Sequence, residues 1–440
     1  MKKVLFAILI ILSVCLCSQE PLELTIDDAI KMALDNNTAL QISSQEVKQY
    51  RAKLFQNLGF LPLVTLQGYK NIDEKLMSIE MPALYPGMEP SRFELDFTKN
   101  YEFTLQVVQP IFTGGKILYT VKNAQLDLKI AKEKQRNSRD ETVLNVKKAF
   151  YSIQILNELM KAHQEVLELA ENNYRNVQQS FELGVASQYD RLRAELAVSA
   201  IKPELLRTEN LLQTSLQNLK MLLQIPESRP VNLKGELGYS LYQVELARLL
   251  SSALSNRSEI LQLEMEKKKI NNLLRITLAQ YIPDFGLVAS YSYRSDLFNF
   301  RKNNWEDYYT INLGVNFTVL SGLKKSAQVG EMKVLQKILD LGLKQLSDAT
   351  RLEVANKYRA ISQEYETIQL GLKSVASAKE GVRIAELNYR EGLITILELN
   401  ASYNELTKAR VNYLQALFNY HIAIAELEKI SGFGLTGGDA

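Results

Sequence analysis

Cysteine and histidine are scarce in this 440-residue chain, which has two of each. Both cysteines, Cys15 and Cys17, lie close to the start. The histidines, His163 and His421, lie far apart in stretches that we predict to be helical, at positions typical of a helix surface or seam. No group of cysteine, histidine and acidic residues therefore has metal-site spacing. These absences argue against thiol or metal chemistry and predict a protein that is not an enzyme and has no cofactor.

A strong net charge is also missing, because the formal charge is only +2. The chain thus lacks the basic field that nucleic-acid binding needs. Long apolar runs are absent after the start, so we expect no transmembrane helix of about twenty apolar residues. The apolar run at residues 4–16 follows two lysines and precedes small and polar residues. This pattern predicts a secretory signal peptide at residues 1–17 and an exported protein.

Two outcomes of export stay open for the cysteines. Cleavage after Cys17 leaves a mature protein without cysteine and hence without a disulfide framework. Alternatively, Cys15 or Cys17 becomes a lipidated N-terminal residue. Val14 and Leu16 are bulky for the position that precedes such a cysteine.

The rest of the chain repeats one plan twice. "ALDNNTAL" at residues 33–40 matches "ALSNRSEI" at residues 253–260, within a helix that opens each half. Thr25 is placed to cap the first of these helices, and each helix runs on to a proline, Pro62 or Pro283. Two strands and a long helical hairpin follow. The first predicted repeat spans residues 18–230, with strands at about 62–110 and a hairpin at about 116–225. The second spans residues 231–440, with strands at about 284–320 and a hairpin at about 324–431.

The strands alternate apolar with mildly polar side chains, as Phe103 and Leu105 do with Thr104 and Gln106. Their polar positions carry few charges, and aromatic residues crowd the strand ends, which is typical of an outer-membrane barrel. A soluble sheet that packs its apolar face on helices is the alternative. Four strands cannot close a barrel, so a membrane barrel here requires several chains. We expect a polar loop at residues 71–100 between the first two strands.

Proline is absent from residues 116–180, which predicts a helix of roughly 95 Å at about 1.5 Å per residue. Apolar residues at alternating steps of three and four, such as Val146, Phe150 and Ile153, indicate coiled-coil packing. Pro203 is expected to kink or break the return helix. "FTGGK" at residues 112–116 lacks the spacing of a phosphate-binding loop, and we interpret it as a strand-to-helix turn.

One spaced motif occurs in both predicted hairpins: "FELGVASQYD" at residues 181–190 and "YREGLITILE" at residues 389–398. Each has an aromatic residue, a glycine, a serine or threonine, and an acid at matching positions. With the duplication and the strand pairs, these motifs resemble the TolC-like outer-membrane efflux proteins over nearly the whole mature chain.

The resemblance implies a mixed α/β membrane protein of the cell outer membrane, whose helical part lies in the periplasm. It implies a homotrimer that shares a twelve-stranded β-barrel, four strands from each chain, above a coiled-coil α-helical tunnel. Outer-membrane lipid, a periplasmic adaptor and an inner-membrane transporter are the implied partners. Such a channel-tunnel exports small molecules or proteins that the transporter supplies.

The resemblance also implies two kinds of site at the hairpin tips. The adaptor-docking tips correspond to Leu183, Gly184, Val185, Glu391, Gly392 and Leu393. The periplasmic gate corresponds to Asp190, Tyr389 and Glu398. The Tyr389 hydroxyl is expected to donate to the Asp190 carboxylate and hold the pore closed. Glu398 is expected to form an acidic ring in the lumen that favours cations.

The chain departs from the family at two positions. Ile394 stands where the family has a gate arginine, with Arg390, Arg191 or Arg193 as candidate substitutes. Ala401 stands where a second acidic ring requires an acid.

Plainer interpretations stay open. The motif glycines are also typical of helix C-caps, and the acids of ordinary surface charges. A periplasmic coiled-coil scaffold without a pore and a type I protein-secretion duct of the same fold are the competing functions.

Overall fold

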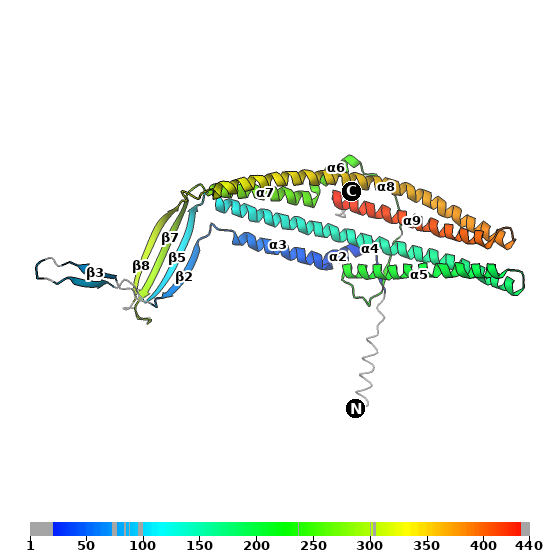
Figure 1. Cartoon of the computed structure of the whole chain (residues 1–440), viewed down its shortest axis with the longest axis horizontal. Coiled ribbons are helices and arrows are strands. Elements are labelled where there is room, and N and C mark those ends of the chain that lie inside the picture. The colour runs from blue at the N-terminus through cyan, green and yellow to red at the C-terminus, as the bar shows by residue number, and fades with distance from the viewer. Residues whose placement is uncertain are drawn as a thin grey trace, which may run out of the picture. The chain divides into compact units, whose positions relative to one another are not determined.

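The computed structural model describes residues 21–72, 77–82, 85–87, 89–95, 100–235, 237–299, 301 and 305–432 (Figure 1). The predicted signal peptide and both cysteines lie outside them. The first repeat contains α2 (Ile26–Asn36), α3 (Thr38–Gln56), β2 (Leu63–Lys70), β5 (Tyr101–Phe112), α4 (Lys116–Glu182) and α5 (Gln188–Leu223). The second contains α6 (Leu246–Asn256), α7 (Ser258–Ala279), β7 (Asp284–Ser295), β8 (Glu306–Asn316), α8 (Lys324–Arg390) and α9 (Ile396–Ser431).

The chain forms two compact units. The first comprises the described parts of residues 1–46, 132–262 and 343–440, and the second residues 47–131 and 263–342. The first unit holds the free ends of the hairpins, and the second holds the sheet. Two short strands, β1 (Leu22–Leu24) and β6 (Val231–Leu233), pair in parallel in the first unit. No helix in the described ranges is both long and apolar enough to cross a membrane.

The helices of the two hairpins match in length. Helices α4 and α8 have 67 residues each, and α5 and α9 have 36 each. Lys116 corresponds to Lys324 and Gln188 to Ile396, an offset of 208 residues in both cases. Each position in the first hairpin therefore has a counterpart 208 residues later in the second.

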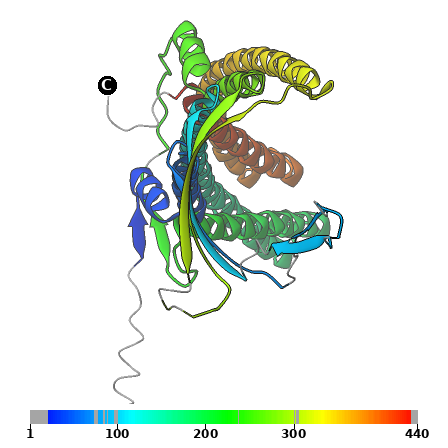
Figure 2. The ribbon, with the colours of Figure 1, turned by 90° about the vertical axis from the view of Figure 1, so that its left-hand side faces the viewer.

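Four antiparallel strands form one sheet in the order β2-β5-β7-β8 and curve together (Figure 2). Their register aligns apolar residues across the sheet, and one exposed row consists of Leu66, Leu105, Tyr291 and Tyr309. The neighbouring row on the other face consists of Thr65, Gln106, Ser290 and Thr310. Period-two alternation thus separates an apolar face from a polar one, as the sequence predicts. Within the described part of the chain, the outer edges of β2 and β8 have no partner strand.

The segment between β2 and β5 is more ordered than the polar loop expected there, and that expectation is wrong. Strands β3 (Met77–Met81) and β4 (Ser91–Leu95) form an antiparallel hairpin. A Pro86-Gly87 step lies between them, and Gly87 has a φ of +103°, a value that glycine adopts readily.

Each opening helix is divided in two, which the sequence interpretation missed. Asn37 separates α2 from α3 and has extended backbone. Its side chain accepts from the Ala39 N–H and donates to the Leu222 carbonyl of α5. Arg257 separates α6 from α7 and instead binds Glu353 of α8 at 2.7 Å. At both breaks, the side chain of the linking residue thus binds a longer helix.

Pro203 does not break α5, which runs unbroken from Gln188 to Leu223. The proline removes one backbone donor, leaving the Ser199 carbonyl without its intrahelical partner. Both residues are exposed, so water can satisfy that carbonyl. By contrast, the predicted Thr25 cap is confirmed, since its hydroxyl accepts from the Asp28 N–H.

The two histidines lie in separate, packed surroundings. Across the described residues, no three acidic, cysteine or histidine side chains gather closely enough to bind an ion. His421 stacks on Tyr151, with ring centroids 4.4 Å apart. His163, only 6% exposed, lines a cavity of about 350 Å³ with Arg193 of α5 and Asn400 of α9. Burial lowers the pKa of both imidazoles, and Glu204 partly opposes this at His163. Burial therefore favours the neutral form of both histidines.

We expect the melting temperature of the purified protein to decrease as the pH is lowered from about 7.5 to 5.5, because the unfolded imidazoles have an ordinary pKa of about 6.5. A histidine whose folded pKa is lowered contributes stability above the unfolded pKa and loses it as the pH falls. The double variant His163→Gln/His421→Gln should lose most of this pH dependence. An unchanged slope in calorimetric melts would contradict the assignment.

Candidate functional site at the hairpin tips

The first tip turns through a Schellman motif around Gly184. The Val185 N–H donates to the Ser180 carbonyl at 2.8 Å, and the Gly184 N–H donates to the Phe181 carbonyl at 3.0 Å. Gly184 has a φ of +74°, and a side chain of normal chirality is strained in that conformation. The glycine therefore ends α4 and starts the reversal.

The second tip repeats this geometry at Gly392, which has a φ of +73°. The Leu393 N–H donates to the Asn388 carbonyl at 2.8 Å, and the Gly392 N–H donates to the Tyr389 carbonyl at 3.0 Å. The C-cap interpretation of both glycines is thus confirmed, and these C-caps lie where the hairpins reverse.

The acids of the two motifs begin the return helices. Asp190 accepts from the Ser187 hydroxyl at 2.7 Å, while the Ser187 oxygen accepts from the Asp190 N–H at 3.1 Å. Glu398 accepts from the Thr395 N–H at 2.7 Å and from its hydroxyl at 3.0 Å. Both pairs are capping boxes. Backbone and hydroxyl donors of Thr395 lower the pKa of the exposed Glu398. Helix capping alone therefore accounts for the acid in each motif.

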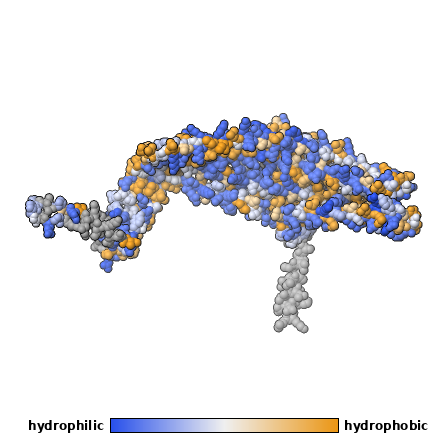
Figure 3. All heavy atoms as spheres, viewed as in Figure 1, coloured by the Kyte–Doolittle hydropathy of each residue, from blue (hydrophilic) through white to orange (hydrophobic). Residues whose placement is uncertain are grey.

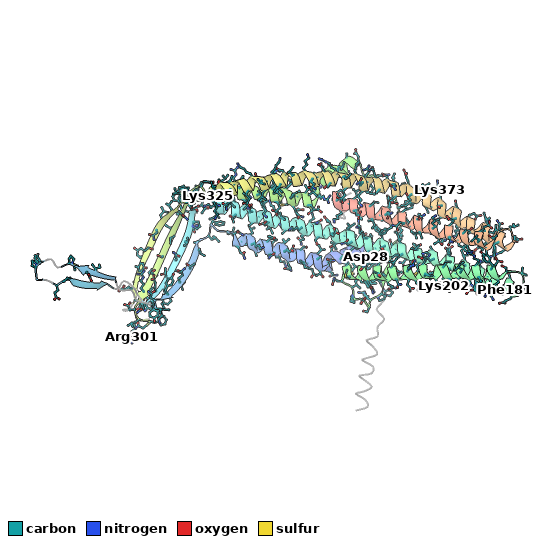
Figure 4. The ribbon with its side chains drawn as sticks, viewed as in Figure 1. Asp28, Phe181, Lys202, Arg301, Lys325 and Lys373 are labelled. Carbon is teal, nitrogen blue, oxygen red and sulfur yellow. The ribbon has the colours of Figure 1, made fainter. Side chains whose placement is uncertain are left out.

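Large apolar side chains remain exposed at the tips. Leu183 is 80% exposed and Leu393 72%, and Val185 and Glu391 are exposed beside them. Apolar residues gather at this end of the helices (Figure 3), where Phe181 is also found (Figure 4). A Cβ placed on Gly184 or Gly392 has no atom within 4 Å. The tips thus present a small apolar surface to solvent.

Asp190 and Tyr389 lie in the same part of the molecule. Both line a cavity of about 470 Å³ between the hairpins, together with Glu386, Arg390 and Ile394. Burial raises the pKa of Tyr389, and the Asp190 charge adds to that rise. In the described residues of this one chain, no hydrogen bond joins the two side chains. Glu398 is not among the residues lining this cavity.

Ile394, which stands where the resemblance predicts a gate arginine, packs in an apolar cluster with Leu399 and Tyr403. The Tyr403 hydroxyl donates to Glu386 at 3.0 Å, and burial raises the pKa of Tyr403. Arg390 lines the cavity beside this pair.

The other two candidate arginines are held by neighbours on the first hairpin. Arg193 donates to the Tyr189 hydroxyl at 2.8 Å. Arg191 lies over the Phe181 ring, 5.3 Å from its centroid. Of these three arginines, Arg390 is therefore the one that lines the cavity with Asp190 and Tyr389.

Ion pairs that no motif predicted join the two hairpins of the chain. Helix α4 contacts α9 through Glu141–Lys429, Lys147–Glu428 at 2.6 Å, Lys148–Glu426 at 2.7 Å, and Glu165–Arg410 at 2.6 Å. The partners are 245 or more residues apart in the sequence, where pattern analysis has no signal. We call this set of contacts the within-chain seam.

Known proteins resemble this chain along most of its length. The outer membrane efflux protein family matches residues 29–223 and 249–433. The probable efflux pump outer membrane protein TtgC of Pseudomonas putida is 22% identical over 370 residues, which cover 83% of this chain and 74% of TtgC. The antibiotic efflux pump outer membrane protein ArpC of Pseudomonas putida has the same identity and coverage.

Solved structures share the fold. The outer membrane protein VceC of Vibrio cholerae has a TM-score of 0.77 at 16% identity, over 93% of this chain and 97% of VceC. The CmeC outer membrane channel of Campylobacter jejuni has a TM-score of 0.77 at 15% identity, over 94% of this chain and 87% of CmeC. The expected combination of a strand sheet with long paired helices is confirmed. The chain belongs to the outer membrane efflux protein family and is an efflux channel of the outer membrane, with its helical part in the periplasm.

Proposed function

We propose that three copies of this chain form one channel-tunnel, which takes compounds from an inner-membrane transporter through a periplasmic adaptor and releases them outside the cell. The observation that carries this proposal is an apolar face of α8 that is bare in the single chain. Leu352 is 60% exposed, whereas its counterpart Leu144 on α4 is 5% exposed. Leu370 is 66% exposed, whereas its counterpart Ala162 is 8% exposed.

The second repeat of the same chain explains why the α4 face is buried. Leu144 lines a cavity together with Ile430 of α9. A further copy of the first repeat supplies the equivalent cover for α8 only if it comes from another chain. The internal repeat therefore favours a closed ring of copies.

The sheet requires neighbours for the same reason. The unpaired edges of β2 and β8 cost several kcal/mol for each unsatisfied backbone group in lipid. Pairing β8 of one copy with β2 of the next removes both edges. Three copies then close a barrel of twelve strands, whose exposed apolar rows face lipid.

The exported compounds are proposed to be small molecules. ArpC is named as an antibiotic efflux protein, and one TtgC of Pseudomonas putida as a toluene efflux protein. These names favour small-molecule export over a type I protein-secretion duct. The adaptor is proposed to bind the exposed tips, and Asp190 with Tyr389 to hold the pore closed.

One prediction concerns assembly. The detergent-extracted protein should have the mass of a trimer and give small channels in planar bilayers. Leu352→Glu should yield monomers without channels, because a charge replaces the covered apolar contact. Leu241→Glu, at another exposed leucine outside the hairpins, is the matched control. A monomer that leaves membranes with high salt and forms no channels would instead support the scaffold function.

Cation preference of the channel reports on the proposed Glu398 ring. Glu398→Gln keeps an oxygen that can accept from Thr395, so the helix cap survives while the charge is lost. Cation preference should then decrease. An unchanged reversal potential in a salt gradient would contradict the proposed acidic ring.

Another prediction concerns the gate. Asp190→Asn combined with Tyr389→Phe should raise single-channel conductance, because the carboxylate and the hydroxyl are lost together. Ser187→Ala is the control, because it weakens the same capping box and leaves Asp190 charged. Equal conductance in the wild type and the double variant would contradict the gate assignment. A rise in conductance with Ser187→Ala alone would assign the effect to capping.

A further prediction concerns docking. Leu183→Glu with Leu393→Glu should abolish cross-linking of the periplasmic adaptor while trimers still form, since both side chains are exposed in the single chain. Leu241→Glu again serves as the control. Normal adaptor cross-linking in the double variant would place the docking surface elsewhere.

A further inference from the structure

His163 of α4 is a buried polar side chain without a partner. Its exposed fraction is only 6%, and no group in the described part of the chain hydrogen-bonds its imidazole ring. Buried polar groups in folded proteins are nearly always hydrogen-bonded, because an unpaired one is costly. The ring lines the cavity of about 350 Å³ that α5 and α9 complete. A molecule bound in this cavity is therefore in a position to supply the missing partner.

A second polar group lines the same cavity from another helix. Asn400 of α9 has its Oδ1 atom buried, and this oxygen has no hydrogen-bond partner among the described residues. The amide oxygen and the imidazole ring come from segments more than 200 residues apart in the sequence, and they are not bonded to each other. Two unsatisfied groups that meet at one cavity indicate a ligand site.

The internal repeat shows that the fold itself requires neither group. With the offset of 208 residues, His163 corresponds to Gly371 of α8 and Asn400 corresponds to Leu192 of α5. A Cβ placed on Gly371 would lie 3.3 Å from Tyr413 of α9, so the second hairpin packs tightly at this position. The first hairpin has an imidazole and a cavity there instead. Equivalent packing is thus achieved without a polar side chain.

The remaining wall of the cavity is mostly apolar. Leu196 and Leu397 are 57% and 58% exposed, so the cavity is accessible from solvent between these two side chains. The other apolar lining residues are Ala197, Ala200, Ile201, Ala401 and Tyr403. An apolar wall with a few polar groups is typical of small-molecule sites. Because a cavity of about 150 Å³ holds benzene, this one has room for a substituted aromatic ring.

Charges at the cavity favour a neutral ligand. Arg193 and Glu204 both line it, and their opposite charges offset each other. Each also has a neighbour on α5, since Arg193 donates to the Tyr189 hydroxyl at 2.8 Å and Glu204 pairs with Arg207 at 2.6 Å. No net charge is therefore available to hold an ionised compound.

The two unsatisfied groups differ in what they need. A neutral imidazole has one N–H donor and one acceptor nitrogen, whereas the Asn400 oxygen only accepts. A hydroxyl group serves both, because it accepts from the His163 N–H and donates to the Asn400 Oδ1 atom. An ether oxygen accepts but does not donate, so it leaves the amide oxygen unpaired. The chemistry of the cavity thus selects a hydroxyl.

We propose that this cavity is a binding site for a neutral aromatic compound with a hydroxyl group, of the phenol class. His163 and Asn400 bind the hydroxyl, and the leucine and alanine side chains bind the ring. One chain supplies every lining residue, so the site goes beyond the proposed function and does not depend on the trimer. Each chain has one such site, because Gly371 and Leu192 replace the polar pair in the other repeat.

The test measures binding of two matched compounds to the purified, detergent-solubilised full chain by titration calorimetry. 4-Methylphenol carries the hydroxyl, and 4-methylanisole is the same ring with that hydroxyl methylated. One 4-methylphenol should bind per chain. 4-Methylanisole should bind about tenfold more weakly, because it leaves the Asn400 oxygen buried and unpaired.

Three variants locate the site. Asn400→Leu should weaken binding of 4-methylphenol about tenfold and leave 4-methylanisole unchanged, because only the contact to the hydroxyl is lost. Ala200→Trp should abolish binding of both compounds by filling the cavity. Ser199→Trp is the matched control, since Ser199 is an exposed neighbour on α5 that does not line the cavity. Melting temperatures near that of the wild type show that the variants fold.

Three results would overturn the proposal. Equal affinities for the two compounds show that the hydroxyl is not recognised. Normal binding to Ala200→Trp shows that the compounds bind elsewhere. No binding of either compound shows that the polar pair is only hydrated. A monomer by mass that still binds 4-methylphenol supports the site and contradicts the proposed trimer, so the two proposals fail separately.

Discussion

Every backbone donor and acceptor within a membrane needs a partner, and a sheet of four strands leaves two edges without one. This constraint shapes the chain around its neighbours. The register aligns Leu66, Leu105, Tyr291 and Tyr309 in a row that is exposed in the single chain. Such a row is costly in water and favourable in lipid. The proposed ring of three copies would satisfy the edges and the apolar row together.

The repeat extends the same logic to the helices. Because the hairpins have equal lengths, the face that α4 buries within the chain reappears on α8. Leu144 is covered and Leu352 is bare, although both are leucines at equivalent positions. In the proposed ring, the difference comes from whether the next repeat belongs to the same chain.

Local chemistry made much of the fold predictable from the sequence. Period-two alternation predicted the four strands of the sheet, and the absence of proline predicted α4. The helix breaks at Asn37 and Arg257 were not predicted, because each involves a contact with a distant helix. The expected break at Pro203 was wrong, because the freed Ser199 carbonyl is exposed and open to water. The Pro86-Gly87 step signals the β3–β4 hairpin and was overlooked.

The tips show how far a motif supports a functional assignment. The Schellman turn explains the glycine of each motif. The capping box explains the serine or threonine, and it also favours an acid at the positions of Asp190 and Glu398. The motif therefore locates the reversals reliably and says little about a gate. The ion pairs between α4 and α9 are different, because their partners lie 245 or more residues apart and neither capping nor helical periodicity signals them.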